Sequence, residues 1–194
     1  MFNAVSGYDQ FHKSILDFLG KGYWDKDQKL FLSWREHKNY QYALDTHSWG
    51  YCAFPRMTRD ILKNTDRYVV TKTAVANGEK VSGFCFDTDL DTIWLEGTGQ
   101  MIVAFQSAGM YAEAKKYLRE MNKMILVVSE KSHQAGLPYV TNKGTHYGHG
   151  KLWRGAETMP SVSSSVWYLF GKLGFDPMEE GRKKTIPKSD RFWK

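Results

Sequence analysis

The residues best suited to chemistry lie in the stretch WLEGTGQ at positions 94–100. Its only carboxylate, Glu96, stands between an aromatic ring and two glycines, and glycines let a ligand or another backbone approach closely. A carboxyl group in such a place can exchange a proton with a substrate or stabilise a positive charge. A structural role is the alternative, because glycines near a helix start weaken the helix by about 1 kcal/mol each and something must offset that cost.

Two other stretches resemble this one, since in each a short polar residue is followed four positions later by a large ring or amide side chain. The pairs are Asp45 with Trp49, Glu96 with Gln100, and Ser163 with Trp167. Self-similarity of this kind indicates stacked supersecondary units. If the units are equivalent, the three polar residues lie at helix N-termini and form a rim at a common end of the domain. An acid at such a position can also be a simple helix cap, which is our preferred interpretation of Asp45.

Apolar residues spaced three and four apart predict the helices that would carry these residues. Helices are expected at 8–19, from 45 to near Pro55, in broken form over 57–75, and at 92–108, 110–128 and 161–173. The pair on either side of Gly109 predicts an antiparallel helical hairpin. Loops are expected at 24–34, which could hold a short extended piece, at 81–91 and at 134–160. The last of these is long enough to suggest a functional loop.

Composition favours one soluble domain at 1–178 followed by a basic tail at 179–194, since 194 residues with 42% apolar content can build one sizeable core. The net charge of +6 comes largely from that tail, and no nucleic-acid-binding motif accompanies it, so nucleic acid is not an expected partner. No stretch approaches the roughly 20 apolar residues of a transmembrane helix. Cys52 and Cys85 are expected to be buried free thiols.

The start of the chain lacks the basic and apolar pattern of a secretory signal, which by default predicts a cytoplasmic protein. An extracytoplasmic location is the alternative if the chain is a processed piece of a longer protein.

Four stretches together resemble the C-terminal half of bacterial α/α-toroid proteins of the six-hairpin glycosidase type. They are DTHSWG, GFCFDTDLDTIWLEGTGQMIVAFQSAG, GLPYVTN and PSVSSSVWYLFGKLGFDPM, within residues 8–178. The resemblance implies an all-α fold in which helical hairpins form part of a toroid, here about three to four of them. Such a partial ring would be a fragment, an open half-toroid, or a ring completed by a protein partner or another copy of the chain.

The resemblance also implies a carbohydrate cleft at the N-termini of the inner helices. Glycoside hydrolysis usually needs two carboxyl groups, one of which protonates the leaving oxygen. Glu96 could be that acid, with Asp45, Asp91, or one of Asp87 and Asp89 as its partner. The expected substrate-binding residues are Trp94, Gln100, Trp49, His47, His146, Tyr147, His149, Trp153 and Arg154.

Several alternatives remain open beside a glycoside hydrolase or sugar-binding domain. The acids at 87, 89 and 91 could bind Ca²⁺, although a calcium loop would need glycine where Thr92 stands. They also faintly resemble the acid motif of class II terpene cyclases, while a solvated loop is the simplest interpretation. His146 and His149 could bind a transition metal, but no acidic ligand is near them. We therefore expect no metal and no cofactor. The remaining alternative is a non-catalytic structural or assembly domain that binds a protein partner.

Overall fold

The computed structural model describes residues 9–37, 41–54, 57–129, 131, 134–143, 155–179, 188, 191 and 193. Of these residues, 46% are helical and 17% lie in strands, which form three small antiparallel sheets. The expectation of an all-α partial toroid is therefore wrong, and the chain has a mixed fold of helices and short strands. Within the described part, no helix is long and apolar enough to cross a membrane.

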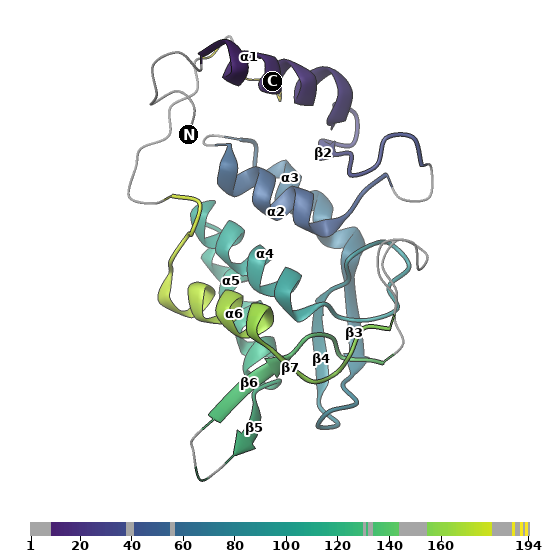
Figure 1. Cartoon of the computed structure of the whole chain (residues 1–194), viewed down its shortest axis with the longest axis vertical. Helices are drawn as coiled ribbons and strands as arrows, with labels where there is room; N and C mark the ends of the chain where they lie inside the picture. Colours follow the sequence, from purple (N-terminus) through teal and green to yellow (C-terminus); the bar gives the residue numbers. More distant parts are fainter. Residues whose placement is uncertain are drawn as a thin grey trace.

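Groups of helices and groups of strands follow one another along the chain (Figure 1). The α-helices are α1 (Asp9–Phe18), α2 (Leu44–Ala53), α3 (Asp60–Lys63), α4 (Leu95–Ser107), α5 (Tyr111–Asn122) and α6 (Val162–Leu173). A π-helical turn, η2 (Leu19–Tyr23), follows α1, and a 3-10 helix, η4 (Asn64–Tyr68), follows α3. The strands are β1 (Trp24–Asp25), β2 (Leu30–Phe31), β3 (Val69–Thr73), β4 (Lys80–Phe84), β5 (Leu126–Ser129), β6 (Gln134–Pro138) and β7 (Pro160–Ser161). The sheets pair β1 with β2, β3 with β4, and β6 with both β5 and β7.

Helix α4 is the centre of the fold and packs against α2, α5 and α6. In Figure 1, α2, α4 and α6 follow one another along the long axis of the molecule. Every residue of α4 from Gly97 to Phe105 is buried. This stretch carries apolar or small residues on all sides, which is typical of a helix surrounded by protein. The helix predicted at 92–108 is therefore confirmed, with its start at Leu95.

Strands β3 and β4 form a hairpin where the sequence interpretation expected the last part of a broken helix over 57–75 and a loop over 81–91. Five residue pairs are in register along the hairpin, and the hydroxyl groups of Thr71 and Ser82 lie 2.7 Å apart across it. Valine and threonine favour such half-buried strands, so local β propensity and cross-strand pairing prevail over the apparent helical spacing. Gly78 has a φ of +75° and lies in the hairpin turn, not at a helix end.

A second correction concerns the single helix predicted at 110–128. Helix α5 ends at Asn122, and the last three residues of the stretch ILVV at 125–128 belong to strand β5. Its β-branched residues favour a strand once β6 is available as a partner. The loop predicted at 134–160 is also wrong at both ends, which form β6 and β7. Because these two strands pair, the start of α6 lies beside β6.

The predicted helices that correspond to α1, α2 and α6 are confirmed. Gly109 and Gly174 follow α4 and α6 with φ values of +69° and +66°. This left-handed conformation ends a helix at low cost only when the residue is glycine. The hairpin of α4 and α5 around Gly109 is confirmed by the contacts between the two helices.

Helix α1 has the amphipathic pattern that its sequence predicts, but only Leu16 is buried. The side chains of Phe11, Ile15 and Phe18 are exposed. The apolar side of this helix therefore faces solvent in the single chain.

Most of the tail predicted at 179–194 lies outside the described residues. Trp193 is an exception, because it is buried and its ring centroid lies 5.8 Å from that of Phe54, which follows α2. Trp193 of the tail therefore packs against the end of α2.

Candidate functional site

Helices α2, α4 and α6 start at a common end of the domain. Their second residues are Asp45, Glu96 and Ser163. Residues at matching levels contact one another: Ser48 Oγ donates a hydrogen bond to Gln100 Oε1 at 3.3 Å, and Gly99 lies against Trp167. The three helices therefore run parallel with their first turns at the same level, as the recurrence in the sequence predicted.

Asp45 is half-buried at the start of α2, and its environment favours the protonated acid. Burial raises the pKa of its carboxyl group above the usual value, and the negative charge of Glu96 raises it further. The backbone N–H groups of Asp45 and Thr46 act in the opposite direction, because they stabilise the carboxylate, but burial prevails. The residue at the N-cap position of α2 is Ala43, so Asp45 is not the cap that the sequence suggested.

Glu96 is held from inside the protein by a short chain of hydrogen bonds. Gln100 Nε2 donates to Glu96 Oε1 at 3.4 Å, and Gln100 in turn accepts the bond from Ser48. Gln100 is only 2% exposed, whereas Glu96 remains accessible to solvent. Gln100 therefore positions the carboxylate and is too deeply buried to lie on an open binding surface.

The glycines of 94–100 serve packing inside the protein. A Cβ added to Gly99 would lie 2.7 Å from Trp167 Cβ and 3.0 Å from the Trp167 carbonyl carbon. A Cβ added to Gly97 would collide with the ring of Trp94, which is 5% exposed and makes an edge contact with Phe86. Gly99 thus allows close approach of another backbone, which was one of the two roles considered from the sequence.

Two tryptophans lie one turn into the helices that flank α4. Trp49 on α2 is 46% exposed, and its ring centroid lies 6.2 Å from that of Trp167 on α6. Both rings follow the acid or hydroxyl residue of their helix by four positions, so they lie on the same side of the helices as Asp45 and Ser163. An exposed aromatic surface therefore adjoins the carboxyl groups.

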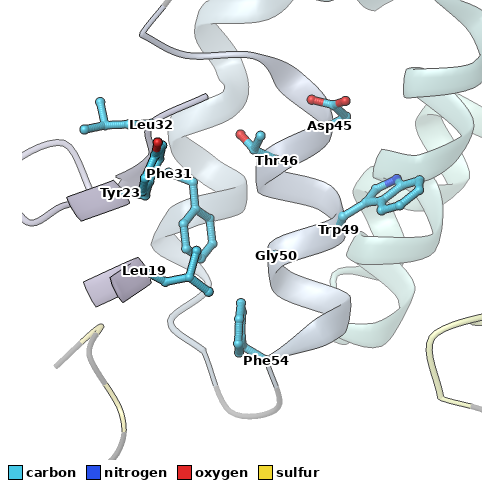
Figure 2. Close-up of a pocket in the computed structure, with 9 residues that line it drawn as sticks. All are labelled: Leu19, Tyr23, Phe31, Leu32, Asp45, Thr46, Trp49, Gly50 and Phe54. Atoms are coloured by element: carbon cyan, nitrogen blue, oxygen red, sulfur yellow. The ribbon is translucent and has the colours of Figure 1, made fainter. Parts of the chain in front are cut away.

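A pocket of about 290 Å³ opens on the other side of Trp49, between α2 on one side and η2 and β2 on the other (Figure 2). Its lining comprises Leu19, Tyr23, Phe31, Leu32, Asp45, Thr46, Trp49, Gly50 and Phe54. The sequence interpretation proposed only Asp45 and Trp49 of these nine as site residues. Four of the seven that it missed lie in the segment before α2, of which 24–34 was treated as a loop. The high proportion of aromatic residues in that segment is the sequence feature that could have indicated the pocket.

His47 and Tyr68 form a buried polar pair beneath the start of α2. Both side chains are 0% exposed, and their ring centroids lie 5.7 Å apart. Burial lowers the pKa of His47 to about 4 and raises that of Tyr68, so both are neutral near pH 7. Neither His47 Nε2 nor the Tyr68 hydroxyl has a hydrogen-bond partner within the described residues. His47 was expected to contact substrate, but its ring lies in the protein interior.

The acidic loop before α4 gathers around a cysteine and not around Glu96. Cys85 Sγ lies 3.6 Å from Asp89 Oδ1 and 3.7 Å from Asp91 Oδ1. These three ligand-type atoms lie within 4.8 Å of one another. Burial raises the pKa of the Cys85 thiol to about 12, which keeps it protonated near pH 7. The two cysteines are free, as predicted, although Cys52 is only partly buried.

Some of the predicted site residues cannot be placed with the others. His146, Tyr147, His149, Trp153 and Arg154 lie in 144–154, outside the described residues. The alternative of a terpene cyclase-like toroid, suggested by the acids at 87, 89 and 91, is wrong in its fold, because the chain has a mixed fold of helices and strands. Of the predicted catalytic residues, Asp45 and Glu96 interact electrostatically, and Asp91 belongs to the cysteine cluster.

Comparison of the chain with protein-family models, with curated proteins and with solved structures gives no match in any of the three.

Proposed function

We propose that this chain binds carbohydrate at the N-termini of α2 and α4 and uses Asp45 and Glu96 to cleave a glycosidic bond. The observation that carries the proposal is the pair of interacting carboxyl groups, one of which is driven toward its protonated form. Glycoside hydrolysis needs this asymmetry, with one carboxylic acid and one carboxylate beside the bond to be broken. The sequence suggested Glu96 as the acid, but the burial of Asp45 favours Asp45 for that role.

In the proposed reaction, Asp45 gives its proton to the glycosidic oxygen while the bond between that oxygen and the sugar C1 breaks. The electron pair of the bond goes to the departing oxygen, and positive charge develops on the sugar ring. Glu96 stabilises that charge, directly or by activating the water that supplies the new hydroxyl group. The hydrogen bond from Gln100 holds the Glu96 carboxylate in place for this purpose.

The exposed aromatic surface supports a sugar as the ligand. Trp49 offers a large ring that can pack on the apolar face of a pyranose while the ring edge stays near polar groups. Ser163 and Asp45, one turn away on α6 and α2, supply hydroxyl and carboxyl groups for sugar hydroxyls. Aromatic packing combined with a few polar groups is typical of small-molecule sites.

Glycan-array binding followed by measurement of reducing-sugar release tests the proposal. Glu96→Gln and Asp45→Asn should each lower hydrolysis of a bound glycan by about 100- to 10,000-fold, the usual contribution of a positioned acid or base. Glu113→Gln is the matched control, because Glu113 is also an acid in the first turn of a helix but is exposed on α5. Absence of any glycan response from the folded wild-type chain, or equal activity in all three variants, would contradict the proposal.

A second candidate function is self-assembly, and the exposed face of α6 favours it. Residues spaced four, three and four apart form an exposed or partly exposed apolar stripe, namely Val162, Val166, Leu169 and Leu173. Helix α6 is the last of the row α2, α4 and α6, while α1 carries its own exposed apolar side at the opposite end of that row (Figure 1). Two apolar helix faces at opposite ends of this row of helices suit a head-to-tail contact with another copy.

Sedimentation equilibrium tests whether the chain assembles with itself. Association of the wild-type chain should be lost in Leu173→Glu and kept in Arg119→Glu, a charge change on the exposed side of α5. A wild-type chain that stays monomeric at high micromolar concentration would exclude assembly as its function.

A further inference from the structure

The pocket beside Asp45 has a polar end and an apolar end. Figure 2 shows the Asp45 carboxyl, the Thr46 hydroxyl and the Tyr23 hydroxyl at one end, with Leu19 and Phe54 at the other. The Thr46 hydroxyl already donates to the backbone carbonyl of Ala43 at 2.8 Å. A ligand would therefore meet polar atoms near Asp45 and mostly carbon elsewhere.

This distribution argues against a sugar ring as the occupant of the pocket. A sugar carries hydroxyl groups around its whole periphery, and those beside Leu19 and Phe54 would lose water without gaining hydrogen bonds. An apolar ring with one oxygen satisfies both ends, because its carbon atoms meet the apolar side chains and its oxygen lies near Asp45.

The volume of the pocket sets the size of the occupant. A cavity of about 150 Å³ is known to accept a benzene molecule. The pocket of about 290 Å³ is thus large enough for about two fused rings or one substituted ring. Its shape depends on Phe31, whose ring lies over Gly50 so closely that a Cβ there would come within 2.7 Å of Phe31 Cδ2.

From these observations we infer that the pocket is the binding site for an apolar, ring-sized leaving group, so that the preferred substrates are glycosides of aromatic or alicyclic alcohols. The inference rests on the proposed function, and it assigns the two halves of the substrate to different surfaces. The sugar lies on the Trp49 and Glu96 side, and the leaving group lies in the pocket. After cleavage the leaving group carries the proton of Asp45 and departs as a neutral alcohol or phenol.

Two pocket variants and one control allow a direct test. Gly50→Ala should push the Phe31 ring into the pocket, and Leu19→Trp should fill its apolar end from a different element. Gly22→Ala is the matched control, because its Cβ would make only an ordinary 3.6 Å contact with Arg35. The probe is 2-naphthol, with binding followed by isothermal titration calorimetry, and thermal melting confirms that each variant is folded.

We expect saturable binding of one 2-naphthol per wild-type chain, weakened at least tenfold in Gly50→Ala or Leu19→Trp and unchanged in Gly22→Ala. Absence of saturable binding, or binding that both pocket variants leave unchanged, would overturn the inference. Among glycosides that the wild type cleaves, the 2-naphthyl glycoside should have a KM at least tenfold below that of the methyl glycoside, and equal KM values would also overturn it. If 2-naphthol binds as expected but no glycoside is bound or cleaved, the pocket assignment is supported and the proposed hydrolysis fails.

Discussion

Replacing Gly99 by alanine should lower the stability of the chain, although alanine is the better helix former. The new methyl group would lie 2.7 Å from Trp167 Cβ and 3.0 Å from its carbonyl carbon, against an ordinary separation of about 3.6 Å. Helices α4 and α6 would have to separate by about 0.9 Å, because the obstructing atoms belong to the backbone and Cβ and cannot rotate away. Overpacking of this kind costs about 1–3 kcal/mol, and the gain in helix propensity offsets about 1 kcal/mol of it.

The net loss of up to about 2 kcal/mol corresponds to a fall in Tm of up to about 8 °C for a chain of this length. Differential scanning calorimetry measures it, with Gly22→Ala as a control that adds the same methyl group in ordinary contact. Near-ultraviolet circular dichroism should change as well, since Trp167 moves relative to Trp49. A Gly99→Ala variant that melts above the wild-type temperature would refute the close packing of α4 on α6.

Three further predictions follow from buried polar groups. The pKa of Asp45 is raised on folding, so its stabilising contribution is complete below the unfolded value of 3.8 and is lost as the pH rises through the folded value. The Tm of Asp45→Asn minus the Tm of the wild type should therefore increase as the pH rises from 4 to 7. A difference that decreases over this range would contradict the upward direction of the pKa shift. Thr98→Val should lower the free energy of unfolding, measured by urea denaturation, by about 1–3 kcal/mol, because it leaves the buried N–H of Phe84 without its acceptor at 3.1 Å. An unchanged midpoint of urea denaturation would count against that hydrogen bond. At pH 8, iodoacetamide should label Cys52 well before Cys85, which is 1% exposed and holds its proton, and mass spectrometry of the peptides would show the order.

The sequence was a good guide to the helices and a poor one to the strands. The starts of α2, α4 and α6 follow from local periodicity, and a helix satisfies its hydrogen bonds within one segment. The strand β3 was mistaken for a helix because its apolar residues also fit a helical spacing. Its actual partner, β4, was read as a loop, since neither segment shows by itself that the other will pair with it.

Within the site, the sequence alone determined which residue types recur and at what spacing. Asp45, Glu96 and Ser163 were expected at matching helix positions, because a repeat of short polar residues at helix starts is a local pattern. Only the tertiary structure decided that Asp45 and Glu96 interact while Asp91 turns toward Cys85. Burial by neighbouring segments also decided that the pKa of Asp45 is raised and that Gly99 serves the contact with α6. These outcomes depend on which distant segments surround a side chain, and the local spacing of residues does not indicate those segments.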